Sequence, residues 1–265
     1  MSESQPSVED IRGVFRLVNA CCENWDDPEA WQATLLEGVT QMIDCQATQL
    51  QLARPSANPE LPDIVPLASS GWIESWHEDV YRQSVADTTR PTMPNAGSVI
   101  APAVGDGSAA AFTRTMVVPD DVWYGCEFYQ QYVEPLGLDE WVMAIRAAPQ
   151  FRAMIMFGGS RRSGEPTYEA RRVQLLGILA EEIVPLMGTR LSLEGQVSKA
   201  GLTARQRQTL ELLLDGLSEK QVARELGLSP ATVHDYIVRL HRHFDVSSRG
   251  ELLSYFIKRR PKGSP

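Results

Sequence analysis

Apolar residues recur at helical spacing through the last quarter of the chain. In the helix expected over residues 230–243 they stand at intervals of four, three and four, which places them on one face. A shorter helix before it carries apolar residues that can cover this face. The residues concerned are Val233, Ile237, Leu240 and Phe244 on the longer helix, and Val222, Ala223 and Leu226 on the shorter one. The opposite face of the longer helix is therefore left polar and basic.

Helix starts in the same region carry a recurring pair of polar residues. Three times a serine or threonine is followed three residues later by glutamine or glutamate, the spacing at which each side chain can bond a free backbone N–H. The pairs are Thr203 with Gln206, Ser218 with Gln221, and Ser248 with Glu251. Before the longer helix, Gly227 marks a sharp turn, Ser229 is expected to cap the helix, and Pro230 suits its first position. Two short helices joined by a tight turn are the layout of a helix-turn-helix DNA reader.

The outer face of the 230–243 helix is predicted to lie in the major groove of DNA. His234, Asp235 and Val238 are placed to reach base edges, and the basic side chains near them suit phosphate oxygens. The residues expected to contact DNA are Lys220, Gln221, Arg224, Ser229, Thr232, His234, Asp235, Val238, Arg239, Arg242 and Arg249.

Charge agrees with this interpretation. Residues 199–265 carry 12 Lys and Arg against 7 Asp and Glu, whereas the whole chain has a net charge of −9. A basic C-terminal part on an acidic body is typical of a duplex-binding domain joined to a domain that does not bind DNA.

Residues 202–257 resemble the LuxR-type (FixJ/NarL-like) four-helix DNA-binding domain of bacterial transcription regulators. The landmarks LTxR, GLSxKxxAxxLxxSxxTV and VxSR stand at residues 202–205, 216–233 and 246–249. Two positions depart from the family pattern: Gln206 replaces the usual Glu, and His234-Asp235-Tyr236 replaces the frequent Lys-x-His. The base preference of the family is therefore not transferred. The resemblance implies that the last helix pairs two subunits, unless its apolar residues only complete the domain's own core; they are Leu252, Leu253, Tyr255 and Phe256.

The first 190 residues alternate helical and strand-like patterns, which predicts an α+β fold. Helices are expected over residues 8–24, 28–43, 73–86 and 120–134, strands over 47–53 and 63–69, and a loop over 91–107. Strands over 140–147 and 151–157 form a hairpin in which Phe151, Ala153, Ile155 and Phe157 face one side. A long helix from residue 167 to beyond 191 closes the domain and runs toward the DNA reader.

This order of helices around a small antiparallel sheet is similar to that of GAF and PAS-like sensor domains. Residues 122–129 followed by 134–139 also resemble a stretch found in GAF-like domains of LuxR-type regulators. We therefore expect a GAF/PAS-like sensory domain over residues 1–190, a linker over 191–200, and the all-α four-helix domain over 201–265.

Aromatic residues are frequent in the expected sensory domain. Small-molecule pockets favour aromatic walls with a few polar groups, and the candidates here are Trp76, Tyr81, Trp123, Tyr129 and Trp141. Trp76, Tyr81 and Asp87 are similar to ligand residues of autoinducer-binding LuxR domains, although their spacing differs. The alternative is that these aromatic side chains form the hydrophobic core.

Composition excludes several other classes of protein. The chain has 265 residues, 43% hydrophobic and 22% charged, and no apolar run reaches the roughly 20 residues of a membrane span. Its polar, acidic start lacks the basic region of a signal peptide, so a cytoplasmic protein is expected. Cys21, Cys22, Cys45 and Cys126 form no CxxC motif and are expected to be reduced core thiols, with a redox-active Cys21-Cys22 pair as the alternative.

No catalytic site, metal site or cofactor is expected. Three of the four histidines lie in the predicted DNA-binding helix, which leaves His77 alone as a base or ligand in the larger domain. Asp26-Asp27 and Asp120-Asp121 do not follow the apolar strand that a phosphoacceptor site needs. The sequence predicts a bacterial transcription regulator that is not an enzyme, binds double-stranded DNA as a homodimer and responds to a small-molecule effector or a partner. Two alternatives remain, a protein-interaction module with a degenerate helix-turn-helix and an autoinducer-binding quorum-sensing regulator.

Overall fold

The computed structural model describes residues 5–54, 62–86, 107–193, 204–244 and 246–257. Its contacts divide the chain into two units, Met1–Leu193 and Glu194–Pro265. The first unit combines a sheet with helices and the second is helical, so the predicted α+β fold is confirmed. The predicted linker lies mostly outside the described residues, and its extent stays a prediction.

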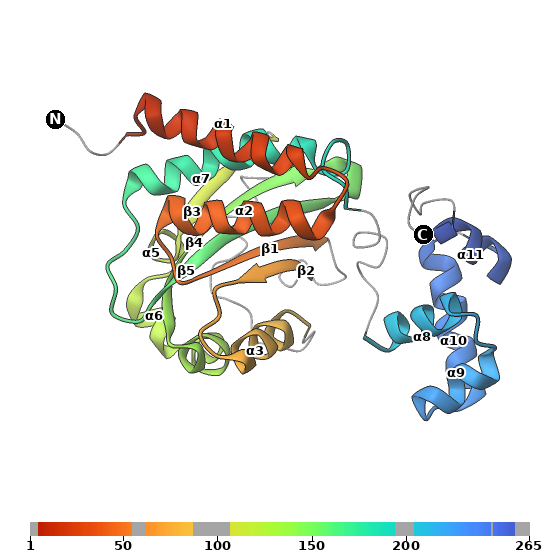
Figure 1. Ribbon diagram of the computed structural model, residues 1–265. Helices are drawn as coiled ribbons and strands as arrows, with labels where there is room; N and C mark the ends of the chain where they lie inside the picture. The colour runs from red at the N-terminus through yellow and green to blue at the C-terminus, as the bar shows by residue number, and fades with distance from the viewer. Residues whose placement is uncertain (1–4, 55–61, 87–106, 194–203, 245, 258–265) are drawn as a thin grey trace. The chain divides into compact units, whose positions relative to one another are not determined.

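A five-stranded antiparallel sheet forms the centre of the first unit (Figure 1). Its strand order is β2-β1-β5-β4-β3. The strands are β1 (Ala47–Arg54), β2 (Asp63–Ser70), β3 (Ala110–Thr113), β4 (Leu138–Ala148) and β5 (Ala153–Arg162). The predicted hairpin of β4 and β5 is confirmed with one difference, because Phe151 lies in the 3-10 turn Pro149–Phe151 and not in the strand. Arg152 follows with a left-handed φ of 48°, which turns the chain into β5.

Helices lie on both sides of this sheet (Figure 1). One layer contains α1 (Val8–Glu23), α2 (Pro28–Ile43) and α7 (Ala170–Ile183), with α1 packed on α2 and α7. On the other side lie α3 (Ser75–Ala86), α6 (Asp120–Gly125) and a π-helix, Tyr129–Val133. Side chains alternate along a strand, so β4 directs Trp141 and Met143 toward α6 and its intervening residues toward α7.

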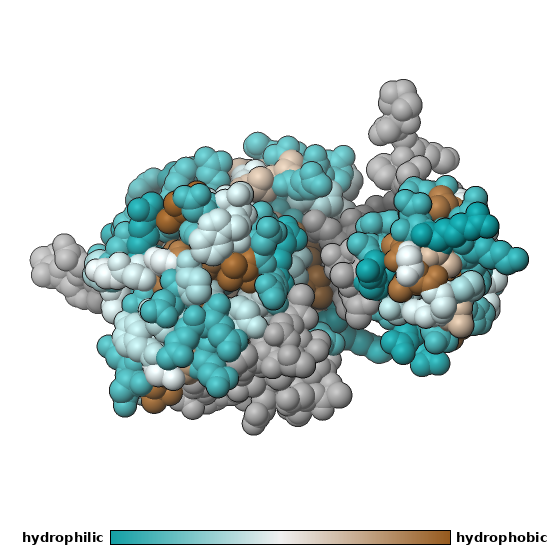
Figure 2. Space-filling model, turned by 90° about the horizontal axis from the view of Figure 1, so that it is seen from below, coloured by the Kyte–Doolittle hydropathy of each residue, from teal (hydrophilic) through white to brown (hydrophobic). Residues whose placement is uncertain are grey.

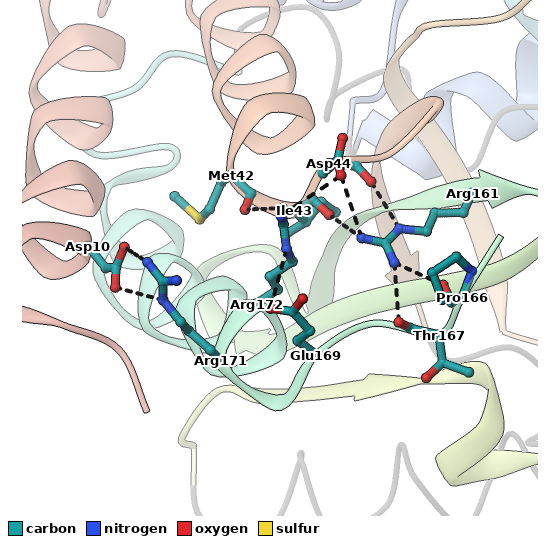
Figure 3. A network of polar contacts seen from close by, with 10 residues as sticks. All are labelled: Asp10, Met42, Ile43, Asp44, Arg161, Pro166, Thr167, Glu169, Arg171 and Arg172. Carbon is teal, nitrogen blue, oxygen red and sulfur yellow. Dashed lines mark hydrogen bonds and ion pairs between the residues drawn. The ribbon is translucent and has the colours of Figure 1, made fainter. Parts of the chain in front are cut away.

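Arg161 anchors the sheet to the helical layer (Figure 3). Its guanidinium is buried at the end of β5 and lies over the ring of Tyr168, 4.3 Å from the ring centre. The guanidinium N–H groups donate to the backbone carbonyls of Ile43, Asp44, Pro166 and Thr167. A single cation therefore satisfies the free carbonyls at the C-terminus of α2 and those of the segment that leads into α7.

Two further arginines hold the helices of that layer together (Figure 3). Arg172 of α7 donates to the backbone carbonyl of Met42 in α2, with an Nη1–O distance of 3.1 Å. Arg171 pairs through two N–H groups with the carboxylate of Asp10 in α1, and its Nε lies 2.8 Å from Oδ2. These hydrogen bonds from Arg171, together with those from Ser7, hold the pKa of Asp10 well below its usual range.

The prediction of one long helix at the end of the first unit is wrong in its extent. α7 ends at Ile183, one 3-10 turn follows at Val184–Leu186, and the helix does not continue to residue 191. Pro185 has no N–H to continue the helical ladder, and Gly188 adopts a φ of 75° that reverses the chain.

The prediction of a single helix over residues 120–134 is also wrong, because this segment forms three short helical pieces. α6 ends where Cys126 adopts an extended backbone, and the π-helix and the 3-10 turn Glu134–Leu136 follow. The sequence pattern also missed β3 and α5 (Arg114–Val117), whose four residues each are too short for a periodic signal. The predicted loop over 91–107 lies almost wholly outside the described residues.

The four cysteines are free thiols. Cys21 is buried and Cys45 is half-buried, and desolvation raises the pKa of each to about 12. A thiol with such a pKa is almost wholly protonated at neutral pH and reacts slowly. These two cysteines therefore suit the role of core thiols.

The described residues of the second unit form four helices around one apolar cluster. They are α8 (Ala204–Leu214), α9 (Glu219–Leu226), α10 (Pro230–Phe244) and α11 (Arg249–Ile257), as the all-α prediction required. The cluster consists of Leu210, Leu213, Val222, Ala223, Val233, Ile237, Leu240, Phe244 and Leu252. The predicted apolar faces of α9 and α10 are confirmed, with Leu226 only partly buried at the margin of the cluster.

Candidate nucleic-acid interface

The turn between α9 and α10 is built by the polar residues that the sequence indicated. The backbone N–H of Ser218 donates to Oε1 of Gln221 at 2.9 Å, which closes the start of α9. Gly227 ends α9 with a φ of 63°, in the left-handed region that favours glycine. Ser229 then caps α10, because its Oγ accepts the backbone N–H of Thr232 at 3.1 Å.

The cap of α11 differs in one detail from its prediction. Oγ of Ser248 accepts the N–H of Glu251 at 3.2 Å, as expected. The carboxylate of Glu251 reaches the N–H of Ser247 at 2.7 Å, one residue earlier than predicted. The remaining predicted pair, Thr203 with Gln206, cannot be compared with the structure, because Thr203 lies outside the described residues.

The outer face of α10 is exposed along its length. His234, Asp235, Val238, Arg239 and Arg242 are all exposed, and Val238 retains 41% of its accessible surface. Lys220, Gln221 and Arg224 of α9 are exposed as well, and so is Ser229 in the turn. Thr232 is half-buried, with its Oγ1 2.8 Å from Oγ of Ser229.

An acidic neighbour of His234 was missed by sequence reasoning. Oε2 of Glu219, at the start of α9, lies 3.4 Å from Nδ1 of His234. A carboxylate on Nδ1 orients the imidazole and leaves Nε2 directed away from it. The pair is 15 residues apart along the chain, so only the helix-turn-helix geometry brings its members together.

Other predicted contact residues lie in the domain's own packing. Arg249 is half-buried, and its Nη2 donates to the carbonyl oxygen of Leu213 at 3.3 Å, which ties α11 to α8. Leu252 is completely buried in the apolar cluster, which leaves it no surface for a second subunit. Leu253 is half-buried, and the side chains of Tyr255 and Phe256 lie outside those described.

Residues 200–256 match the family described as bacterial regulatory proteins, luxR family. The C-terminal domain belongs to the LuxR family. The LuxR-type domain is 43% identical over 54 residues to the transcriptional regulatory protein FixJ of Azorhizobium caulinodans, and 47% identical over 51 residues to the transcriptional regulatory protein UhpA of Escherichia coli. These matches cover 20% and 19% of this chain, and the chain spans only 26% of the length of each relative.

Two solved structures are similar to this chain over two thirds of its length or more. SdiA of Escherichia coli is 15% identical, covers 91% of this chain and 95% of its own, and has a TM-score of 0.42. The VqsR LBD domain of Pseudomonas aeruginosa is 14% identical, covers 68% of this chain and 96% of its own, and has a TM-score of 0.41. These TM-scores are too low for the similarity to assign a function or a family to the first unit.

Three of the predicted ligand residues form one aromatic cluster on the α6 side of the sheet. The ring of Trp123 lies 5.4 Å from that of Tyr129 and 6.4 Å from that of Trp141, measured between centres. Trp123 is fully buried, and its Nε1 donates to Oδ1 of Asp139 at 3.0 Å. Tyr124 donates to the same carboxylate, a hydrogen bond that raises the pKa of Tyr124 to about 12. The core interpretation thus holds for Trp123.

The other two predicted ligand residues lie on α3 in different surroundings. Trp76 is 46% exposed and packs edge-on against His77. Tyr81 is buried, its ring lies 5.2 Å from that of Trp72, and its hydroxyl accepts the Nε2–H of Gln51 at 2.9 Å. Burial raises the pKa of Tyr81 above its usual range. Asp87, the acidic residue of the suggested ligand set, lies outside the described residues.

Polar residues of β1 were not anticipated on this side of the sheet. Gln51 is buried and pairs in register with Met156, which pairs in turn with Ile145. Gln49 is half-buried, and its Nε2 lies 3.5 Å from the sulfur of Met143. Glutamine alternates with leucine through residues 49–52, so the period of two in this strand was the signal that could have found them.

A buried ion pair between Arg114 and Glu140 was also missed. Their side chains are 4% and 3% exposed, with Nη2 of Arg114 3.2 Å from Oε2 of Glu140, and Arg114 also pairs with Asp120. Burial raises the pKa of Glu140. Among the described residues no group of three or more His, Cys, Asp or Glu is placed to hold a metal ion. In the same described segments, no helix has the length and apolar character needed to cross a membrane.

Proposed function

We propose that this protein is a transcription regulator whose C-terminal domain binds duplex DNA with α10 in the major groove. The observation that carries the proposal is the exposure of one continuous polar and basic face on α10, behind which Val233, Ile237, Leu240 and Phe244 are buried. Two helices of a dimer would read half-sites about one helical turn, roughly 34 Å, apart.

The chemistry of the α10 face suggests which groups read bases. Asp235 can accept a hydrogen bond from the amino group of cytosine, and the exposed Val238 suits the methyl group of thymine. His234, oriented by Glu219, presents Nε2 to a base edge or a phosphate. Arg239 and Arg242, with Lys220 and Arg224 of α9, supply the positive charge for the backbone.

The DNA proposal is tested by binding of the full chain to duplex DNA as the salt concentration is varied. We expect Arg239→Ala to weaken binding to all sequences and to reduce the slope of log K against log salt by about one. His234→Ala should instead alter preference at one base position. Gln208→Ala, an exposed change on α8 outside the two reading helices, is the control. If neither variant changes affinity, salt slope or preference, α10 is not in the groove.

We also propose that the N-terminal unit is a GAF/PAS-like sensor that binds a small effector on the α3 and α6 side of the sheet. The support is chemical: Gln49, Gln51 and the hydroxyl of Tyr81 lie among methionine and aromatic side chains on that side. Such a surface suits an apolar molecule that carries an amide, ester or hydroxyl group. In Figure 2, viewed from below the layers of Figure 1, hydrophilic residues cover most of the coloured surface and hydrophobic residues emerge in small patches.

The effector proposal is tested by thermal denaturation of the full chain against a metabolite panel. A ligand that binds the folded state raises the melting temperature with its concentration. Gln51→Leu should abolish that rise, whereas Gln41→Leu on α2, in the opposite helical layer, should leave it intact. A panel without any stabilising compound would favour a protein partner as the signal.

The autoinducer-binding alternative makes the same prediction with acyl-lactone compounds as the probe. The other alternative, a protein-interaction module that no longer binds DNA, predicts no salt-dependent binding to any duplex. The basic, exposed face of α10 supports DNA binding over that alternative.

A further inference from the structure

Helix α1 has two apolar faces, and the described residues of the first unit cover only one of them. The inner face buries Val14, Val18 and Cys21 against α2 and α7. A second stripe, at the helical spacing of three and four, leaves Val8, Ile11 and Phe15 exposed by 69%, 37% and 46%. Figure 1 shows α1 as the outermost helix of its layer. A surface helix needs one apolar face, so the second stripe requires another explanation. We call it the α1 stripe.

Charges beside the α1 stripe are self-complementary. Glu9 stands near its start and Arg16 near its end, and Oε1 of Glu9 lies 2.6 Å from Nη2 of Arg16 within the same helix. Arg12 lies between them, 3.8 Å from Glu9. If a second α1 lies antiparallel to the first, with the two-fold axis between Ile11 and Arg12, Val8 lies opposite Phe15 and Glu9 of each copy comes within about two residues, roughly 3 Å along the helix, of Arg16 of the other. A two-fold axis then matches the stripe with itself in both apolar content and charge.

Ser192 lies close to the point at which the chain leaves the first unit, which we call the exit. This residue is hydrogen-bonded to the chain just beyond the end of the same helix. The N–H of Ser192 donates to the carbonyl of Trp25, just beyond α1, at 2.7 Å. The carbonyl of Ser192 accepts the indole Nε1–H of the fully buried Trp31 at 2.7 Å. The segment before the DNA-binding unit is thereby held at the turn between α1 and α2.

This attachment sets the distance between two exits in an antiparallel pair. Trp25 stands 14 residues after Ile11, and at 1.5 Å per residue each exit would lie about 20 Å from an axis beside Ile11. The two exits would then be about 40 Å apart, close to the roughly 34 Å that separates half-sites one helical turn apart. Parallel pairing would bring the exits together at one end instead.

We infer that the α1 stripe is a homodimer surface, at which α1 packs antiparallel on α1 of a second copy with Ile11 beside the two-fold axis and Val8 against Phe15. The occupant is a second copy because the stripe complements itself and because the exits then match the spacing of two DNA readers. The second reason rests on the proposed function; the contact between the helices does not.

A disulfide cross-link locates the axis directly. In the full chain with Cys22→Ser, to remove the half-buried thiol of α1, Ile11→Cys should form a covalent dimer under mild oxidation. A disulfide needs Cα atoms within about 7 Å, which only residues close to the axis meet. Asn19→Cys is the matched control on the same helix, because eight residues from the axis its two copies would lie about 24 Å apart.

A charge placed in the stripe tests its energetic role. Sedimentation of the full chain should show that Phe15→Glu converts the dimer to monomer and weakens self-association on the order of 100-fold or more, as loss of a central apolar contact does. Phe15→Leu should keep the dimer. Met116→Glu, a change at the 68% exposed Met116 of α5, should also leave it intact. Circular dichroism confirms that each variant is folded.

The cross-linking and sedimentation results test the α1 stripe as a dimer surface whether or not the protein binds DNA. Cross-linking of Ile11→Cys without Asn19→Cys, together with monomeric Phe15→Glu, supports the surface even if no DNA is bound. Equal cross-linking of both cysteine variants, an unchanged dimer for Phe15→Glu, or a wild-type chain that stays monomeric in concentrated solution would overturn it. Salt-dependent DNA binding by a monomeric wild type would leave the proposed function standing and remove this surface alone.

Discussion

The C-terminal unit keeps its charges outside, whereas the N-terminal unit buries several. Among the described residues of the C-terminal unit no charged side chain is buried, and α10 directs its charges to one outer face. The N-terminal unit instead buries Arg114, Glu140 and Arg161. A DNA reader needs a rigid apolar support for an exposed cationic surface. The buried charges fix the arrangement of strands and helices in the larger unit, where a few polar contacts decide between packings.

The strongest test of this difference between the two units is to remove one member of the buried ion pair. Arg114→Ala leaves Glu140 without its partner and should lower the free energy of unfolding of the N-terminal unit by about 3–5 kcal/mol. Because the unpaired Glu140 then has a pKa above its unfolded value, the loss should be largest at neutral pH and fade below about pH 4. Chemical denaturation across pH measures both effects.

Two controls separate charge from packing in that experiment. Arg114→Met combined with Glu140→Leu removes both charges and should be close to neutral, because no buried ion is left unpaired. Arg190→Ala at an exposed position should change stability by no more than about 0.5 kcal/mol. Equal losses from Arg114→Ala and from the double variant would show that packing, and not charge, is responsible.

An apolar truncation in the other unit is expected to have a somewhat smaller effect. Leu240 is fully buried beneath the α10 face, so Leu240→Ala should cost about 3 kcal/mol in the C-terminal unit and weaken DNA binding through unfolding. Val238→Ala, two residues away and exposed, should leave the melting curve unchanged while altering affinity for DNA. Calorimetry with DNA titrations distinguishes the two, and loss of binding by a folded Leu240→Ala variant would contradict this division of roles.

The smallest effect concerns the partly exposed pair between α1 and α7. Asp10→Asn should lower the stability of the N-terminal unit by about 1 kcal/mol at neutral pH, since the Arg171 guanidinium is 41% exposed and solvent weakens the pair. The pKa of Asp10 is depressed in the folded state, so its contribution is complete above about pH 5 and is lost as pH falls below about 4. The difference between wild type and variant should shrink steadily as the pH falls from about 4 toward the depressed pKa of Asp10, and a difference that does not shrink over this range would show a cause other than ionisation.

The fold of the C-terminal unit could be predicted from short stretches of sequence. Its caps and turn are set by residues three apart, such as Ser218 with Gln221, and by a glycine that tolerates a positive φ. Its core follows from apolar residues every three or four positions. The helices α1 and α2 and the strands β1, β2, β4 and β5 were predictable for the same reason, because each has a periodic pattern of its own.

Prediction failed where distant parts of the chain decide the structure. The end of α7, the broken segment after α6 and the four-residue β3 all lack a local periodic signal or contain a proline that overrides one. Aromatic spacing suggested ligand residues, yet the structure separates Trp123 in the core from Trp76 at the surface. Spacing alone does not tell which side of a sheet a helix covers.

Local order, charge balance and the polar and basic face of α10 are therefore determined by the sequence, because caps, helical period and side-chain charge act over a few residues. The tertiary structure alone decided that Glu219 orients His234, that Arg114 is buried with Glu140, and that Phe15 is left outside. These facts depend on which elements pack together. Burial and pairing between residues far apart in the chain are settled only when the sheet and its helices assemble.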